Sequence, residues 1–127
     1  MIVCDTHAWI WWASDDRRLS AAARKKIDAA SDVIISAISC WEVAMLVAKE
    51  RLEFDRDVLR WIQDALSLPR VRLVDLTPEI AVEAARLVWN HRDPADRMIV
   101  ATARLLRAPI ATRDETIASY PAVKVVW

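Results

Sequence analysis

At 127 residues, the chain has the length of one domain that buries about two-thirds of the surface exposed by its unfolded form. Apolar residues make up 55% of it and charged residues 28%, which excludes an intrinsically disordered protein. The formal net charge is zero, so any attraction to nucleic acid or to an anionic membrane must be local. Glycine is absent, and this excludes the P-loop and the dinucleotide fingerprint, in which glycine lets the backbone approach phosphate.

Neither the cysteines nor the first residues indicate an exported protein. Cys4 and Cys40 lack metal-type spacing, so we expect reduced thiols, with a disulfide as the less favoured alternative. The chain does not open with a basic segment, an apolar core and a cleavage site, and no apolar run approaches the roughly 20 residues that span a bilayer. We therefore expect a cytoplasmic protein with no membrane partner.

Short β-branched runs alternate with longer stretches of helical periodicity along the whole chain. The expected elements in chain order are strand 2–5, helices 6–13 and 20–30, strand 33–36, helices 39–51 and 56–68, strand 71–75, helices 78–89 and 94–107, and strands 109–112 and 123–126. Ser20 and Asp93 have the character of N-caps, and Pro78 and Pro94 stand at first-turn positions. Apolar strands separated by helices predict an α/β fold with a parallel sheet covered on both faces, in a single domain over residues 1–127.

Four carboxylates follow strands or stand at helix starts in this predicted order. Asp5 ends the first strand and Asp114 follows the fourth, while Glu42 and Asp96 lie in the expected first turns of two helices. Ligands of open α/β sheets bind at the edge where the carboxyl ends of parallel strands meet. We therefore expect the four acids to come together at that edge.

Helix capping is the simpler alternative for each acid taken singly. Ser39 and Glu42 have the spacing of a capping box, Asp93 and Asp96 have the same spacing, and Asp5 could cap the helix that follows it. Acids in a first helical turn also complement the helix dipole.

The joint arrangement favours a metal site. Two carboxylates about 5 Å apart repel by roughly 3 kcal/mol at an effective dielectric constant near 20, so clustered acids must take up protons or bind a cation. Ligation by oxygen alone favours one or two Mg²⁺ or Mn²⁺ ions, because a zinc site normally includes cysteine or histidine. Carboxylate-held ions of this kind, with open positions, are the usual means of phosphodiester hydrolysis by a metal-activated water.

Basic residues near the acids are candidates for substrate binding. Arg92, Arg97 and Arg113 could hold a phosphate backbone, although ion pairs with the acids are at least as good an explanation. His7 could act as an acid, a base or a substrate contact, but a structural role is favoured. We assign His91, just before Arg92, to a loop. A mechanism that uses a metal-activated water requires neither histidine.

Four segments carry a resemblance to a known family. The stretches DTHAWIWW, SAISCWEVAML, HRDPADRMIVATA and TRDE, in this order and at these separations, resemble PIN-domain ribonucleases of the VapC toxin type over residues 2–126. The resemblance implies a three-layer α/β/α sandwich with a central parallel sheet of four to five strands. It also implies a Mg²⁺- or Mn²⁺-dependent endoribonuclease that acts as a toxin on RNA, and a VapB-type antitoxin that occludes the site.

The family's acidic quartet falls on the four residues that the strand-end argument selects. By resemblance, the metal-binding and catalytic residues are Asp5, Glu42, Asp96 and Asp114. Thr112 matches a hydroxyl position beside the last acid, and Asp93 matches an additional acid, with an N-cap as the equal alternative. The chain departs from the family pattern at Ala95, Leu46 and Glu50, where phenylalanine, lysine and glycine are frequent, and this puts substrate contacts rather than metal binding in doubt.

Three tryptophans follow Asp5 within one predicted helix. Trp9 and Trp12 share a helix face and Trp11 points elsewhere. A domain of this size does not easily bury all three, so we expect part of the cluster to form a homodimer interface or the antitoxin-binding groove. Stacking on RNA bases is a less favoured alternative.

Two other function classes use the same sheet edge. One is a non-catalytic PIN-like module that recognises a protein or RNA partner, with the acids kept as helix caps. The other is a phosphoacceptor receiver or an aspartate-nucleophile phosphatase. Receivers gather an acid pair near the first strand and a lysine after the last, whereas Asp5 has no acidic neighbour and Lys124 lies inside the expected final strand.

Overall fold

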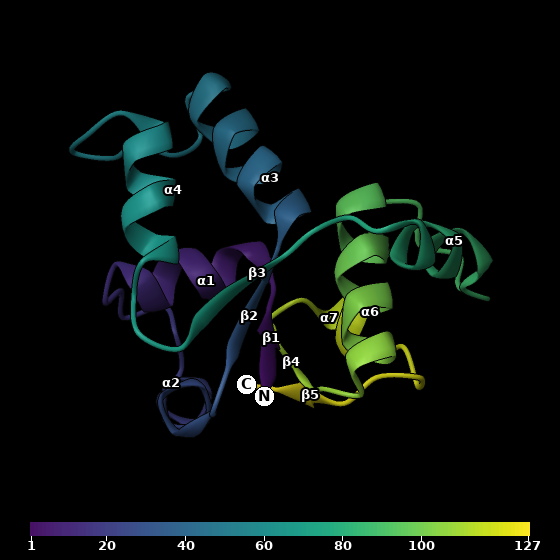
Figure 1. The fold of residues 1–127 in the computed structure, drawn as a ribbon. Helices are drawn as coiled ribbons and strands as arrows, with labels where there is room; N and C mark the ends of the chain where they lie inside the picture. Colours follow the sequence, from purple (N-terminus) through teal and green to yellow (C-terminus); the bar gives the residue numbers. More distant parts are fainter.

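The chain folds around one parallel sheet of five strands in the order β3-β2-β1-β4-β5 (Figure 1). The computed structural model describes residues 1–127. The strands are β1 (Ile2–Cys4), β2 (Val33–Ser36), β3 (Val71–Val74), β4 (Ile110–Ala111) and β5 (Val125–Val126). In the central register, Val3 stands opposite Ile34 of β2 and Ile110 of β4. The predicted α/β fold with a central parallel sheet is confirmed.

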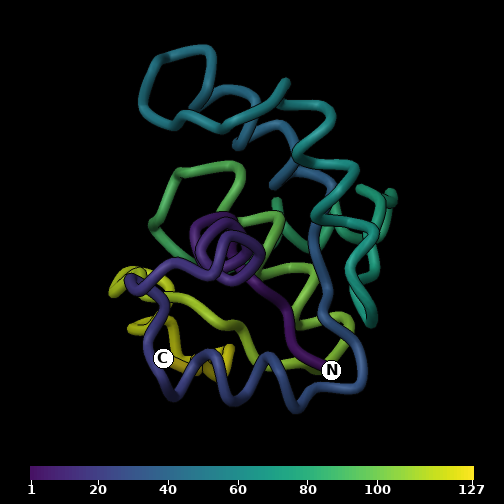
Figure 2. The backbone as a smooth tube through the Cα atoms, turned by 90° about the vertical axis from the view of Figure 1, so that its left-hand side faces the viewer, coloured from purple at the N-terminus to yellow at the C-terminus, as the bar shows by residue number.

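Seven helices cover the sheet and complete a three-layer α/β/α sandwich. They are α1 (Thr6–Ala13), α2 (Ala21–Ala29), α3 (Ala37–Ala48), α4 (Val58–Leu66), α5 (Pro78–Arg86), α6 (Pro94–Leu106) and α7 (Glu115–Ala118). Because successive strand residues point to opposite faces, Cys4 packs with α1, α2 and α4, whereas Val3 packs with α6 and α7. Helix α5 lies outside α6, and the α3–α4 pair extends away from the sheet (Figures 1 and 2). None of these helices combines the length and the apolar character that a membrane span requires.

The start of α3 differs from the prediction because its cap lies earlier. Ser36, the last residue of β2, accepts a hydrogen bond from the Ile38 amide at 3.3 Å and caps the helix. Helix α3 therefore begins at Ala37, two residues before the expected start, and Ser39 is buried inside it. Ser39 is not an N-cap, and the predicted capping box is wrong.

The segment between α5 and α6 also differs from the prediction. The helix expected over 78–89 ends at Arg86, and residues 87–93 form an irregular segment. Helix α7 was not predicted, because four residues are too few to show helical periodicity.

The tryptophan cluster packs on its own chain more fully than expected. Trp9 is completely buried, with its ring centroid 5.3 Å from that of Trp61. Trp11 is 8% exposed, and the half-buried Trp12 donates its indole N–H to Asp28 Oδ1 at 2.8 Å. Core packing therefore accounts for Trp9 and Trp11, and the prediction that part of the cluster forms an interface is left to the half-buried Trp12.

Four residues stand in the left-handed backbone region that glycine would normally occupy. They are Asp15, Glu50, Arg70 and Arg107, with φ between 52° and 68°. Glu50 follows the cap of α3, where the resemblance leads to glycine. In a chain without glycine each such position costs about 1 kcal/mol.

Candidate active site

The predicted acids converge on one cavity at the carboxyl edge of the sheet. The cavity has a volume of about 390 Å³. Its nine lining residues are Asp5, Thr6, His7, Trp11, Glu42, Asp93, Asp96, Arg113 and Asp114. They come from the ends of β1 and β4 and from α1, α3 and the start of α6, so the parallel topology brings together side chains that are far apart in sequence.

Asp5 is held at the end of β1 through both carboxylate oxygens. Its Oδ1 accepts a hydrogen bond from the Ala8 amide at 2.9 Å, which caps α1, and its Oδ2 accepts one from the Thr112 hydroxyl. Thr112 also accepts the Asp114 amide at 3.0 Å and thus links two members of the predicted quartet. Burial raises the pKa of Asp5, and the hydrogen bonds from Thr112 and Ala8 oppose that shift.

Glu42 faces the cavity from the second turn of α3. Since the helix begins at Ala37, no acid stands in its first turn, so neither capping nor the helix dipole accounts for this carboxylate. The Thr6 hydroxyl donates to Glu42 Oε1 at 2.5 Å, and its oxygen lies 2.9 Å from Ser39 Oγ. Burial raises the pKa of Glu42, while the hydrogen bond from Thr6 lowers it.

Asp96 lies in the first turn of α6 and pairs with a histidine. His91 Nε2 stands 2.7 Å from Asp96 Oδ2. Burial raises the pKa of Asp96 to about 6, and the negative charges of nearby acids add to the shift, against the hydrogen bond from His91. Asp96 therefore lies close enough to the other acids for their charges to raise its pKa, in line with the predicted cluster.

Asp93 and Asp114 combine a capping role with a place in the cavity. Asp93 Oδ1 accepts the Asp96 amide at 3.2 Å and caps α6, so the N-cap prediction is confirmed. Asp114 Oδ1 accepts two amides at the start of α7, which leaves Oδ2 without a partner in the chain. One ligand atom each from His91, Asp93 and Asp96 lies within 4.8 Å of the others, a spacing that a metal ion could bridge.

The charge and chemistry of the four predicted ligands fit a divalent cation, and Asp96 is the one of them that belongs to the close group with His91 and Asp93. No lysine or arginine forms an ion pair with any of the four predicted ligands, and His91 is the only basic partner of one of them. Three of the four have pKa values raised by burial, so the chain alone leaves their negative charge uncompensated. Carboxylate oxygens with this surplus charge are typical ligands of Mg²⁺ and Mn²⁺.

Comparison with known proteins identifies the fold family. Residues 2–123 match the sequence profile of the PIN domain. The chain belongs to the PIN-domain family. It is 36% identical to Ribonuclease VapC22 of Mycobacterium tuberculosis (strain ATCC 25618 / H37Rv), across 99% of this chain and 98% of that protein. The chain is thus a PIN domain of the VapC type.

Solved structures show the same fold. FitAcB from Neisseria gonorrhoeae superposes on this PIN domain with a TM-score of 0.69 at 24% identity, covering 98% of this chain and 96% of that one. A toxin-antitoxin complex from Klebsiella pneumoniae gives a TM-score of 0.66 at 23% identity, covering 97% and 95%.

The PIN domain brings only some of the predicted basic residues to the cavity. His7 and Arg113 line it, with the Arg113 guanidinium 6.0 Å from the Trp11 ring and the His7 ring 5.6 Å from it. Arg92 is exposed and does not line it. Arg97 is absent from the cavity because its guanidinium donates to four backbone carbonyls of residues 84–91, so its assignment to substrate binding is wrong.

The sequence did not single out three neighbours of the acids. Thr6 follows Asp5 directly, and its position at the first turn of α1 was the available signal. Trp11 lines the cavity one turn after His7. His91 carries no such signal, because its approach to Asp96 depends on the irregular segment that Arg97 holds.

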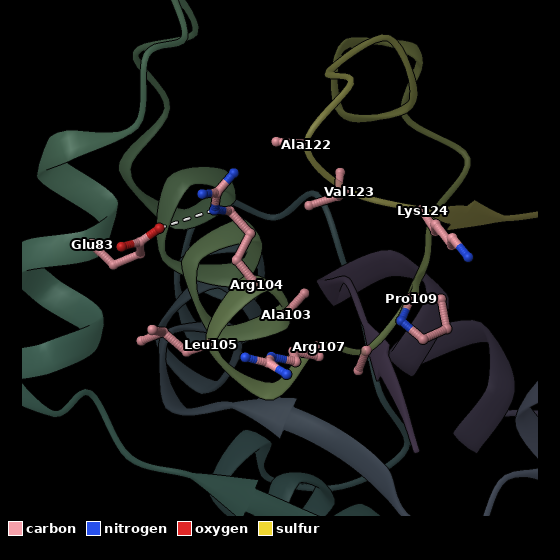
Figure 3. A pocket seen from close by; sticks show the side chains of 10 residues that line it. Glu83, Ala103, Arg104, Leu105, Arg107, Pro109, Ala122, Val123 and Lys124 are labelled. Atoms are coloured by element: carbon pink, nitrogen blue, oxygen red, sulfur yellow. Dashed lines mark hydrogen bonds and ion pairs between the residues drawn. The ribbon is translucent and has the colours of Figure 1, made fainter.

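A larger cavity lies at the opposite, amino edge of the sheet (Figure 3). Its volume is about 830 Å³, and its charged lining residues are Arg104, Arg107, Lys124 and Glu83. Arg104 Nε donates to Glu83 Oε1 at 2.9 Å. Lys124 precedes β5 and lies here, not within the final strand as expected, so no lysine approaches the acids in the way that a receiver requires.

Proposed function

We propose that this PIN domain is a divalent-metal-dependent endoribonuclease and the toxin of a type II toxin-antitoxin pair. The observation that carries the proposal is the convergence of four carboxylates at one sheet edge with no arginine or lysine to neutralise them. The likeness to a protein named as a ribonuclease supports the reaction class, and the fold shared with a toxin-antitoxin complex supports the biological role.

The proposed metal ligands are Asp5, Glu42, Asp96 and Asp114, with Asp93 as an additional candidate. One or two bound Mg²⁺ or Mn²⁺ ions would supply an activated water and would stabilise negative charge on the phosphate and the leaving oxygen. The ligands are oriented before any ion binds, because Thr112 fixes Asp5, Thr6 fixes Glu42 and His91 fixes Asp96.

Arg113 is the proposed contact for an RNA phosphate, since it is the one arginine that lines the cavity and it forms no ion pair. His7 is a second candidate for substrate contact from the same wall as Trp11. Contacts from these two side chains would hold the RNA backbone next to the acids.

A VapB-type antitoxin and a second copy of the chain are the proposed partners in a cytoplasmic setting. The exposed apolar side chains that such contacts could cover include Trp41, 58% exposed, and Leu59, 58% exposed. Both stand on the α3–α4 pair, which extends away from the sheet (Figure 2).

The test is cleavage of single-stranded RNA by the purified protein. We expect cleavage with Mg²⁺ or Mn²⁺, none with EDTA, and none from Asp5→Asn, which should also relieve the growth arrest caused by expression. Unchanged cleavage by Asp5→Asn would refute the metal site. A folded protein that binds its antitoxin but neither cleaves RNA nor binds Mn²⁺ would instead be a non-catalytic binding module.

A further inference from the structure

A groove of about 630 Å³ lies beside the acid-lined cavity. One wall is the irregular segment 88–91, and the other is formed by α7 and the residues that follow it, Ser119 to Pro121. No carboxylate lines the groove, in contrast to its neighbour, so a polyanion could enter it without direct repulsion.

Two hydrogen bonds join the groove to the proposed active site. His91, which lines the groove, contacts Asp96 at 2.7 Å. Thr116, on the opposite wall, donates its amide to Asp114 Oδ1 at 2.8 Å. A strand of RNA with its phosphate at the acids would therefore place an adjacent nucleotide at this groove.

The groove offers apolar surface, part of it aromatic, and free hydrogen-bonding groups. Trp89 is half-buried: its ring stacks on that of the buried Tyr120 with centroids 4.8 Å apart and lies 4.8 Å from the His91 ring, whereas Val88 beside it is 93% exposed. The Asn90 amide and the Thr116 hydroxyl make no hydrogen bond within the chain. Aromatic and apolar surface for a base, with an amide that can donate and accept at the base edge, is how proteins recognise unpaired nucleotides.

The wall that carries these groups is fixed in advance by Arg97. Its guanidinium donates at 2.8–3.0 Å to the carbonyls of Ala84, Leu87, Trp89 and His91. An irregular segment of this kind has few backbone hydrogen bonds of its own. Arg97 of α6 therefore satisfies the carbonyls that would bond to other backbone groups in a helix or sheet. A preformed wall binds a ligand at a smaller cost in conformational entropy.

We propose that this groove binds the base of the RNA nucleotide next to the scissile phosphate, with Asn90 as the residue that distinguishes between bases. The inference rests on the proposed ribonuclease function. Antitoxin docking is less favoured, because Val88 is the one large aliphatic side chain in the groove and most of the other lining groups are polar.

The first test measures binding to short single-stranded RNAs that differ at one base. Asp5→Asn in Mg²⁺ serves as the parent, so that cleavage does not deplete the RNA. We expect the parent to bind the RNA that carries one particular base about tenfold more tightly than the others, which is the discrimination expected of one amide that contacts a base edge. Asn90→Ala should bind all of these RNAs with similar affinity. Gln63→Ala, an exposed amide on α4, is the matched control and should keep the preference.

The second test introduces a negative charge. Val88→Asp should weaken RNA binding by about tenfold, whereas Val82→Asp, on the exposed face of α5, should not. Equal melting temperatures of the two variants would show that both fold. Cleavage-site sequencing of the wild type and Asn90→Ala should show the same change of base preference.

RNA binding or base preference that is unchanged in both groove variants would overturn the inference. So would a loss of antitoxin binding in Val88→Asp with RNA affinity intact, since the groove would then be a protein-docking surface. If either of these results were obtained with a wild type that cleaves RNA, the ribonuclease proposal would still hold. A wild type that binds RNA with an Asn90-dependent preference but does not cleave it would overturn the ribonuclease proposal and the place of the groove beside a scissile phosphate, and it would support only base binding in the groove.

Discussion

The two edges of the sheet differ in how their charges are buried more than in the size of their cavities. At the amino edge, a cavity of about 830 Å³ is lined by exposed cations and by one acid, Glu83, which Arg104 neutralises. At the carboxyl edge, a cavity of about 390 Å³ gathers three buried or half-buried acids, Asp5, Glu42 and Asp96, beside two exposed ones, and none has an arginine or lysine partner. Charges in contact with water cost little, whereas clustered carboxylates out of water repel strongly. Buried like charge, rather than cavity volume, therefore marks the edge at which we propose the active site.

The largest expected effect is the loss of RNA cleavage when an acid at the carboxyl edge is neutralised. Asp96→Asn should lower the cleavage rate by at least about 100-fold, because changes at groups that merely support metal ligands already cost up to that much. The measurement is the initial rate on a labelled RNA in Mg²⁺. The control is Arg107→Gln at the amino edge, which should stay close to the wild-type rate; an equal loss in both variants would erase the distinction between the edges.

The two edges should also differ in what an arginine contributes to stability. Arg97→Ala should lower the free energy of unfolding by about 3 kcal/mol, because four carbonyls lose charge-assisted hydrogen bonds. Arg104→Ala, which breaks a partly exposed ion pair with Glu83, should cost at most about 1 kcal/mol. Denaturant unfolding measures both values. Equal losses of unfolding free energy in the two variants would argue against the role of Arg97 in holding segment 87–93.

The pH dependence of stability should reveal the buried acids. The pKa of Asp96 lies near 6 in the folded chain against an ordinary value of 3.8, so the folded state favours the neutral form. That contribution to stability is complete below about pH 3.8 and is lost as the pH rises through 6. In EDTA, Asp96→Asn should therefore become more stable than the wild type by about 1–2 kcal/mol at pH 7, but not at pH 4.

The matched control for that measurement is Glu83→Gln at the amino edge, where no comparable gain between pH 4 and pH 7 is expected. Thermal melting across this range gives the comparison directly. If the wild type instead gains stability relative to Asp96→Asn as the pH rises, with EDTA present, then burial and the neighbouring acids do not raise the pKa of Asp96.

The smallest expected effect concerns the support that His91 gives to Asp96. His91→Ala should slow cleavage by about tenfold, which corresponds to about 1.4 kcal/mol in the barrier. It should also raise the Mg²⁺ concentration needed for half-maximal rate, because Asp96 loses its orientation. His91→Gln, which retains a donor, should recover part of the rate. Equal rates in His91→Ala and the wild type would show that Asp96 needs no such partner.

The part of the site that follows from strand order was predictable from the sequence. Asp5 and Asp114 come directly after strands, and Asp96 follows a helix-starting proline, so topology alone brings them together. Glu42 was selected for the wrong structural reason. Ser36 starts α3 earlier than expected, so Glu42 stands in the second turn and its position is better explained by the site than by capping.

The groups that depend on irregular backbone could not be predicted. Arg97 follows Asp96 directly, yet neighbours on a helix point about 100° apart, so it turns from the acids to the carbonyls of segment 87–91. That segment then places His91 against Asp96, a contact with no counterpart in the periodicity of the sequence. The burial of Trp11 was not predicted either, because the local pattern does not show that Trp127, at the other end of the chain, packs against it.

The most direct test of the central claim is calorimetric titration of the purified protein with Mn²⁺ at pH 7.5. We expect saturable binding by the wild type and by Arg107→Gln, and no binding by the double variant Asp5→Asn, Asp96→Asn. An absence of binding by the wild type, or equal binding by the double variant, would contradict the claim that the acids at the carboxyl edge form a metal-dependent active site.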